Sequence, residues 1–109
     1  MELWQEIENK CKALDKAIKE LAQNGYDKAQ KEKDYKVAVS KKVFELKENG
    51  TPATLINLVI YGIDEIADLR LQRDLAEAKY NANQEYINVM KLQIKILESQ
   101  LQREYGNAR

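Results

Sequence analysis

The chain has 109 residues, a third of them charged, and its 18 basic side chains are balanced by 18 acidic ones. It has no histidine and a single cysteine, which leaves out the usual general base, the commonest metal ligand and any intramolecular disulfide or thiolate metal cluster. We therefore expect one domain without catalytic activity, without a cofactor and without a metal site.

Residues 2–48 are predicted to form one long helix, ended by Gly50, the residue type that commonly stops a helix. Its first half carries apolar residues at alternating spacings of four and three, which is typical of a coiled-coil seam, the line of side chains that faces a neighbouring helix. This predicted seam consists of Ile7, Cys11, Leu14, Ile18 and Leu21. The stripe lapses over 23–34, where Gly25 leaves open a kink or a break, and it resumes at Tyr35.

Residues 52–61 are predicted to form a short helix, with Thr51 as its N-cap and Pro52 at its first position. Apolar residues surround this helix almost completely, so it should be buried on most sides. It either caps the end of a helical bundle or inserts into another protein. The candidate partner-binding residues are Leu55, Ile56, Val59 and Ile60.

Residues 64–105 contain no glycine and no proline and are predicted to form a second long helix that begins at Asp64. Its seam residues have the same spacing as those of the first helix: Ile87, Met90, Ile94, Leu97 and Leu101. Folding the two long helices antiparallel sets 23–34 opposite 74–85, and both segments are poor in large apolar residues. The pattern therefore predicts a helical hairpin with a thin waist.

A second apolar stripe on the last helix, formed by Val89, Leu92 and Ile96, lies nearly opposite its seam. A helix that is apolar on two faces is normally covered on both. The short helix or a bent first helix could supply that cover within one chain. We expect instead that these residues mediate self-association into a dimer or a larger helical bundle.

The distribution of charges indicates a function less clearly than the apolar pattern does. The candidate nucleic-acid contacts are Lys28, Lys31, Lys33, Lys36, Lys41 and Lys42, which acidic residues interrupt. Proteins that bind nucleic acid through its phosphates usually carry a basic surplus, and this chain has none. No apolar run is long enough to span a bilayer, and the acidic amphipathic N-terminus does not resemble a signal peptide, so we expect a cytoplasmic protein.

The segment from Lys47 to Gln100, with its ENGTPATLI turn and ADLRLQRDLAEAKYNANQEYINVMKLQIKILESQ helix, resembles a family of small helical proteins of phages and prophages of Gram-positive bacteria. The family provides no catalytic residues to transfer. The resemblance implies an accessory protein that acts by binding in the cytoplasm of an infected cell.

These observations predict an all-α protein in which two long antiparallel helices are joined by a short apolar helix and assemble into an oligomeric bundle. We expect a non-enzymatic protein that self-associates and binds a host protein to modulate or inhibit it, for example a defence nuclease, as anti-CRISPR proteins do. The alternatives are a nucleic-acid-associated replication or recombination accessory and a structural assembly protein.

Overall fold

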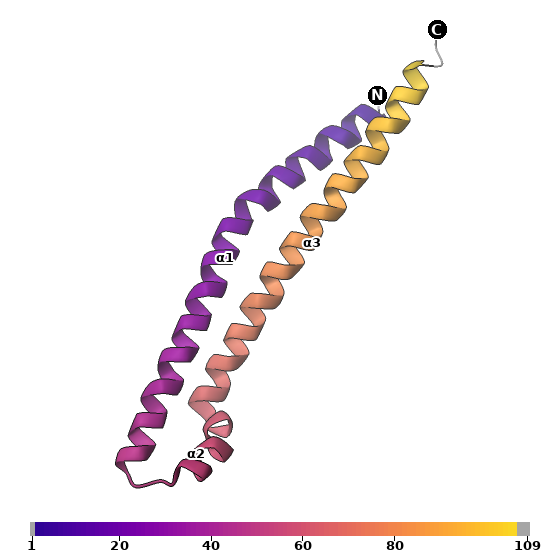
Figure 1. Cartoon of the computed structure of the whole chain (residues 1–109). Coiled ribbons are helices and arrows are strands. Elements are labelled where there is room, and N and C mark those ends of the chain that lie inside the picture. Colours follow the sequence, from indigo (N-terminus) through magenta and orange to yellow (C-terminus); the bar gives the residue numbers. More distant parts are fainter. Residues whose placement is uncertain (1, 107–109) are drawn as a thin grey trace. The chain divides into compact units, whose positions relative to one another are not determined.

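The computed structural model describes residues 2–106, and these are almost entirely helical (Figure 1). The elements are helix α1 (Glu2–Glu48), helix α2 (Ala53–Val59), the 3-10 turn η1 (Ile60–Gly62) and helix α3 (Asp64–Gly106). No strand occurs among the described residues. The predicted all-α class, with two long helices joined by a short one, is confirmed.

Helix α1 remains helical through Gly25 and ends in a Schellman motif. Gly50 has a φ of 83°, a conformation that side chains with a Cβ atom rarely adopt. The backbone N–H of Gly50 donates to the carbonyl of Lys47, and that of Thr51 donates to the carbonyl of Leu46, both at 3.0 Å. These two bonds satisfy carbonyls that the end of a helix otherwise leaves unpaired.

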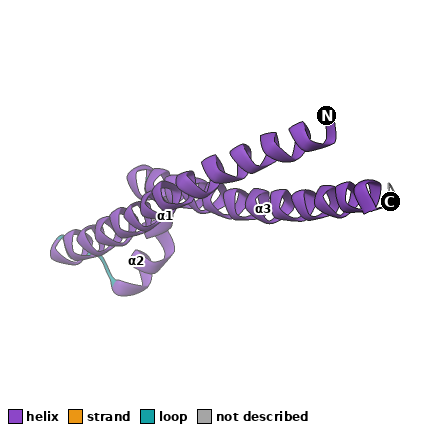
Figure 2. Ribbon diagram, turned by 90° about the horizontal axis from the view of Figure 1, so that it is seen from above, coloured by secondary structure: helices purple, strands orange, loops and turns teal. Residues whose placement is uncertain are grey.

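Helix α2 begins one residue later than predicted, whereas α3 begins at Asp64, where the sequence placed it. The N-cap of α2 is Pro52 in extended conformation, and its carbonyl accepts the first helical bond, so Thr51 is not the cap. In α3, the Ile63 carbonyl accepts a bond from the Ala67 N–H, which makes Asp64 the first helical residue. The carboxylate of Asp64 lies in the first turn of α3, where the positive end of the helix dipole stabilises a negative charge. Figure 2 shows the short loop that joins α1 to α2.

The chain divides into two compact units, each built from parts of both long helices. The first, here called the terminal unit, combines the described residues up to Asn24 with those from Tyr80 on. The second, the turn unit, comprises Gly25–Lys79 and includes α2 and η1. The divisions in α1 and α3 fall within or beside the segments that the sequence shows to be poor in large apolar residues.

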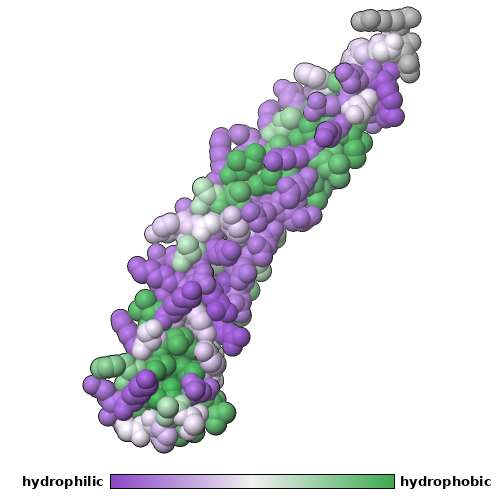
Figure 3. All heavy atoms as spheres, in the orientation of Figure 1, coloured by the Kyte–Doolittle hydropathy of each residue, from purple (hydrophilic) through white to green (hydrophobic). Residues whose placement is uncertain are grey.

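The turn unit has a contiguous hydrophobic core. Tyr35 from α1, Ile56 and Ile60 from the short helical segment and Ile66 from α3 are buried together. Partly buried residues surround them: Ala38, Val39, Val43, Leu46, Ile63 and Leu69. Figure 1 shows α2 between the end of α1 and the start of α3, and Figure 3 shows hydrophobic atoms concentrated at this end of the unit.

A polar edge borders this core. The guanidinium of Arg73 lies 4.6 Å from the centre of the Tyr35 ring, a favourable cation–π arrangement. Arg73 also donates two hydrogen bonds to one carboxylate oxygen of Asp74. The hydrogen bond to Asp74 is the main cause that raises the pKa of Arg73 above its ordinary value. The side chain therefore remains a cation over the tyrosine ring at any physiological pH.

The terminal unit combines buried apolar residues with a buried polar pair. Its buried hydrophobic residues are Ile7, Ala17, Ile87, Met90 and Ile94. Asn24 is also buried, and its amide donates a 2.9 Å hydrogen bond to the side-chain oxygen of Asn83. The amide of Asn83 donates in turn to the Ala17 carbonyl, at 3.2 Å. Early residues of α1 thus meet late residues of α3, so the two segments of this unit are antiparallel.

The predicted seam of α1 is wrong at two positions, because Cys11 and Ile18 are exposed. The residues directly before them face α3 instead, since Lys10 donates a hydrogen bond to Gln93 and Ala17 accepts one from Asn83. One residue corresponds to a rotation of about 100° around a helix. With Lys10 and Ala17 hydrogen-bonded to α3, Cys11 and Ile18 are turned away from that helix.

The other predicted seam residues lie on the facing sides of the two helices. Ile7, Ile87, Met90 and Ile94 are buried, while Leu14, Leu21, Leu97 and Leu101 are half-buried.

Replacing Ile66 with alanine should lower the free energy of unfolding by about 2–5 kcal/mol, because its fully buried side chain would leave a cavity. Urea denaturation followed by circular dichroism would measure this loss. Leu75→Ala on the same helix is the matched control, since Leu75 is 60% exposed and should change stability little. Equal losses in the two variants would contradict this assignment of the core.

The asparagine pair generates a double-mutant prediction. Asn83→Leu should destabilise the protein by about 1–3 kcal/mol, because the buried Asn24 amide loses its partner. Asn24→Leu should lower the free energy of unfolding by a smaller amount, since the Asn83 side chain keeps its hydrogen bond to the Ala17 carbonyl. The double variant should regain wild-type stability or exceed it, as two leucines pack without unpaired polar atoms. Additive losses in urea denaturation would show that the two side chains act independently.

Candidate protein-interaction surface

The most exposed apolar stripe of the terminal unit lies on α3 and contains the residues predicted to mediate self-association. Val89, Leu92 and Ile96 are 40%, 58% and 55% exposed. The buried residues of the same helix segment, Met90 among them, lie on another face. Within the terminal unit, therefore, neither α1 nor another part of α3 covers this stripe.

The predicted partner-binding group on the short helix is split between two faces. Ile56 and Ile60 are each 2% exposed and belong to the core of the turn unit, so they are not available to a partner. They are four residues apart and thus share one helical face. Leu55 and Val59 lie on the other side and are partly exposed, together with the more exposed Leu58.

The six lysines considered for nucleic-acid binding do not form a uniform cationic surface. Lys33, Lys36 and Lys41 are exposed, whereas Lys28, Lys31 and Lys42 are half-buried. Lys36 pairs with Glu32 at 3.5 Å.

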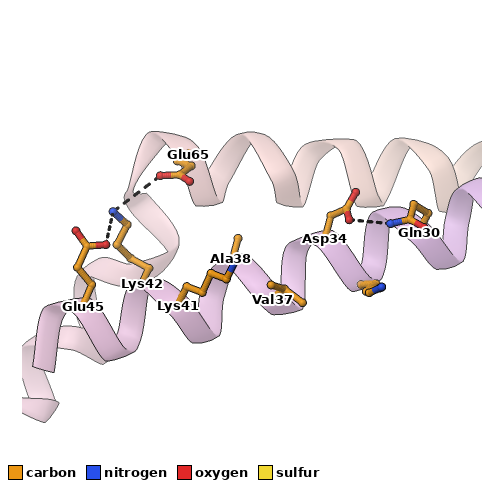
Figure 4. Close-up of a pocket in the computed structure, with 9 residues that line it drawn as sticks. Gln30, Asp34, Val37, Ala38, Lys41, Lys42, Glu45 and Glu65 are labelled. Atoms are coloured by element: carbon orange, nitrogen blue, oxygen red, sulfur yellow. Dashed lines mark hydrogen bonds and ion pairs between the residues drawn. The ribbon is translucent and has the colours of Figure 1, made fainter.

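Lys42 lies between two carboxylates, as Figure 4 shows, 3.4 Å from Glu45 and 3.9 Å from Glu65. An open cleft of about 440 Å³ runs beside it. The cleft is lined by Gln30, Lys33, Asp34, Val37, Ala38, Lys41, Lys42, Glu45 and Glu65. Three carboxylates therefore accompany its three lysines, an arrangement that suits neither a phosphate nor a metal ion.

A second cleft, of about 710 Å³, lies in the terminal unit between the first turns of α1 and the last turns of α3. Trp4 and Tyr105 flank it and are more than half exposed. Ile7 and Leu101 supply apolar surface, and Glu98 supplies a carboxylate. The predicted seam included Ile7 and Leu101 only as packing residues, so the sequence analysis did not identify this cleft. The single tryptophan on a polar helix was the available signal, because exposed aromatic residues often mark interfaces.

Within residues 2–106, no group of three histidine, cysteine, aspartate or glutamate side chains is placed to hold a metal ion. None of the described helices has a stretch long and apolar enough to cross a membrane.

The chain was also compared with known proteins. No family model, no curated protein and no solved structure matches it.

Proposed function

We propose that this protein is a non-enzymatic helical interaction protein that self-associates through α3 and binds a second, different protein. The observation that carries the proposal is the exposed aliphatic stripe of Val89, Leu92 and Ile96, which lies apart from the buried face of the same helix. Covering such a stripe removes apolar surface from water, which is favourable by roughly 25 cal/mol of free energy per Å² buried. Modulation of a host protein, as the resemblance to phage accessory proteins implies, is the role we assign to the assembled protein.

A second copy of the chain is the cover that the stripe fits best. Two antiparallel α3 helices related by a two-fold axis next to Leu92 set Val89 of one copy beside Ile96 of the other, and the reverse. Lys95 of one copy then lies within about one helical turn of both Asn88 and Lys91 of the other, so two lysines meet at the exposed edge of this pairing. The aliphatic residues of the stripe can therefore pair with one another, and the like charges lie only at its edge.

The nature of the other partner follows from the charges. Nucleic-acid binding depends on cations that are available to phosphates. In the turn unit, Lys36 and Lys42 are paired with glutamates, and the lysine-lined cleft carries three carboxylates. Exposed aliphatic and aromatic side chains, in contrast, occur in both units. This distribution supports a protein partner over the nucleic-acid alternative.

Changing the stripe to Val89→Thr, Leu92→Gln and Ile96→Gln together should convert the oligomer into a monomer, because the interface loses its apolar contacts. Sedimentation velocity over a range of protein concentrations would measure the mass. Circular dichroism should show unchanged helix content, since all three side chains are exposed in the single chain.

The matched control replaces Leu71 and Leu75 with glutamine. Both are exposed leucines of α3. In the two-fold pairing, however, they extend past the end of α3 of the other copy and have no helix opposite them. This variant should retain the wild-type mass. A wild-type protein that is monomeric at every concentration, or a triple variant that keeps its oligomeric mass, would refute self-association through the stripe.

A further inference from the structure

The short helical segment formed by α2 and η1 is apolar on the side that faces solvent as well as on the side that faces the core. Its exposed apolar residues, here called the α2 surface, are Leu55, Leu58, Val59 and Tyr61. Leu55, Leu58 and Tyr61 follow one another at intervals of three residues, which places them on the same side of a helical segment. Leu58 is 81% exposed. The buried face of the segment anchors this surface to the core of the turn unit without covering it.

Arg70 of α3 adds a cation beside the α2 surface. This residue is exposed, and its guanidinium lies 5.8 Å from the centre of the Tyr61 ring. Among the described residues, Arg70 forms no ion pair. Asp74 is four residues further along the same helix, within reach of Arg70, but it is hydrogen-bonded to Arg73 instead. The Arg70 guanidinium therefore keeps its donors available to a carboxylate from outside the chain.

We propose that the α2 surface and Arg70 together bind an amphipathic helix of a partner protein, which carries aliphatic residues along one face and a carboxylate at the end of that stripe. Leu55 and Leu58 pack against the aliphatic residues, and Arg70 binds the carboxylate through two parallel hydrogen bonds. Tyrosine and arginine are enriched among the residues that dominate binding energies. This inference rests on the proposed function, because it specifies the chemistry of the second protein.

A second copy of the same surface does not supply that carboxylate. Residues 51–62, which contain α2 and η1, include no acidic and no basic side chain. Two such segments packed against each other would cover their aliphatic residues but would offer no carboxylate to Arg70 of either copy. Charge complementarity therefore favours a different protein as the occupant.

The probe is a capped helical peptide, acetyl-Glu-Ala-Lys-Ala-Leu-Ala-Ala-Leu-Ala-Lys-Ala-Leu-Ala-Lys-Ala-Glu-amide, whose leucines share one face with a glutamate one turn beyond each end. A second peptide has glutamine in place of both glutamates, and a third has alanine in place of the leucines. Each is titrated into the isotope-labelled full chain, and the backbone amide signals are followed by NMR. We expect saturable shifts at residues 55–61 and at Arg70 with the first peptide. The glutamine peptide should bind about tenfold more weakly, and the alanine peptide should not saturate.

Three variants of exposed residues test the roles of the individual side chains. Leu58→Gln should weaken binding of the glutamate and glutamine peptides about tenfold, because both lose the most exposed aliphatic contact. Arg70→Gln should weaken only the glutamate peptide, down to the affinity of the glutamine peptide, since the two changes remove the same pair. Lys79→Gln is the matched control, because Lys79 is an exposed cation of α3 roughly 13 Å along the helix from Arg70, and it should change neither affinity by more than twofold. Circular dichroism would verify that all three variants keep their helix content.

Three outcomes would overturn the proposal. Absence of saturable shifts at residues 55–61 with the glutamate peptide, at concentrations up to about 1 mM, would show that the α2 surface does not bind such a helix. Equal affinity for the glutamate and glutamine peptides would remove Arg70 from the site. Shifts at residues 55–61 that follow protein concentration and are insensitive to every peptide would assign the surface to contacts between copies of this chain.

The titration is repeated on the variant of Val89, Leu92 and Ile96, whose mass is measured separately. That stripe belongs to the terminal unit and the α2 surface to the turn unit, so the two can fail independently. Absence of peptide binding by a protein that self-associates would reject the α2 surface alone. Peptide binding by a wild-type protein that is monomeric would reject the α3 interface alone.

Discussion

A helix can bury only one face against a single neighbouring helix, and this geometric limit determines most features of the protein. Along α3 the buried and half-buried side chains from Leu69 to Leu101 recur at spacings of three and four residues, which keeps them on one face. Apolar residues elsewhere on the helix, such as Val89 and Leu92, remain exposed. The exposed apolar surfaces are therefore a direct consequence of a fold with two long helices.

The facing sides of the helices are not uniformly apolar, and their polar members decide which side chains are exposed. In the terminal unit, Asn24 and Asn83 are hydrogen-bonded between α1 and α3, and Asn83 also holds the Ala17 carbonyl. These bonds fix the rotation of α1 about its own axis, because an unpaired buried amide is costly. That rotation turns Cys11 and Ile18 toward solvent. Buried polar residues of this kind commonly fix the register between two paired helices, although they lower the stability of the pair.

The two candidate surfaces of the terminal unit differ in chemistry, which suits them to different occupants. The stripe of Val89, Leu92 and Ile96 is aliphatic and can pair with itself around a two-fold axis. The described residues that line the cleft beside Trp4 and Tyr105 combine aromatic side chains with one carboxylate, that of Glu98. The proposed self-association therefore involves residues that do not line the cleft, and the two surfaces can be altered separately.

The sequence by itself determined the helices, because proline, glycine and apolar periodicity act within a few residues. It indicated the ends near Gly50 and Asp64, the seam of α3 and its second apolar stripe. It did not determine the rotation of α1, since spacings of three and four fit Ala17 and Ile18 almost equally well. Only the hydrogen bonds between the two helices decided that choice. Contacts between residues far apart in the chain also bury Ile56 and Ile60 on one side of the short helical segment. Such contacts likewise form the cleft beside Trp4.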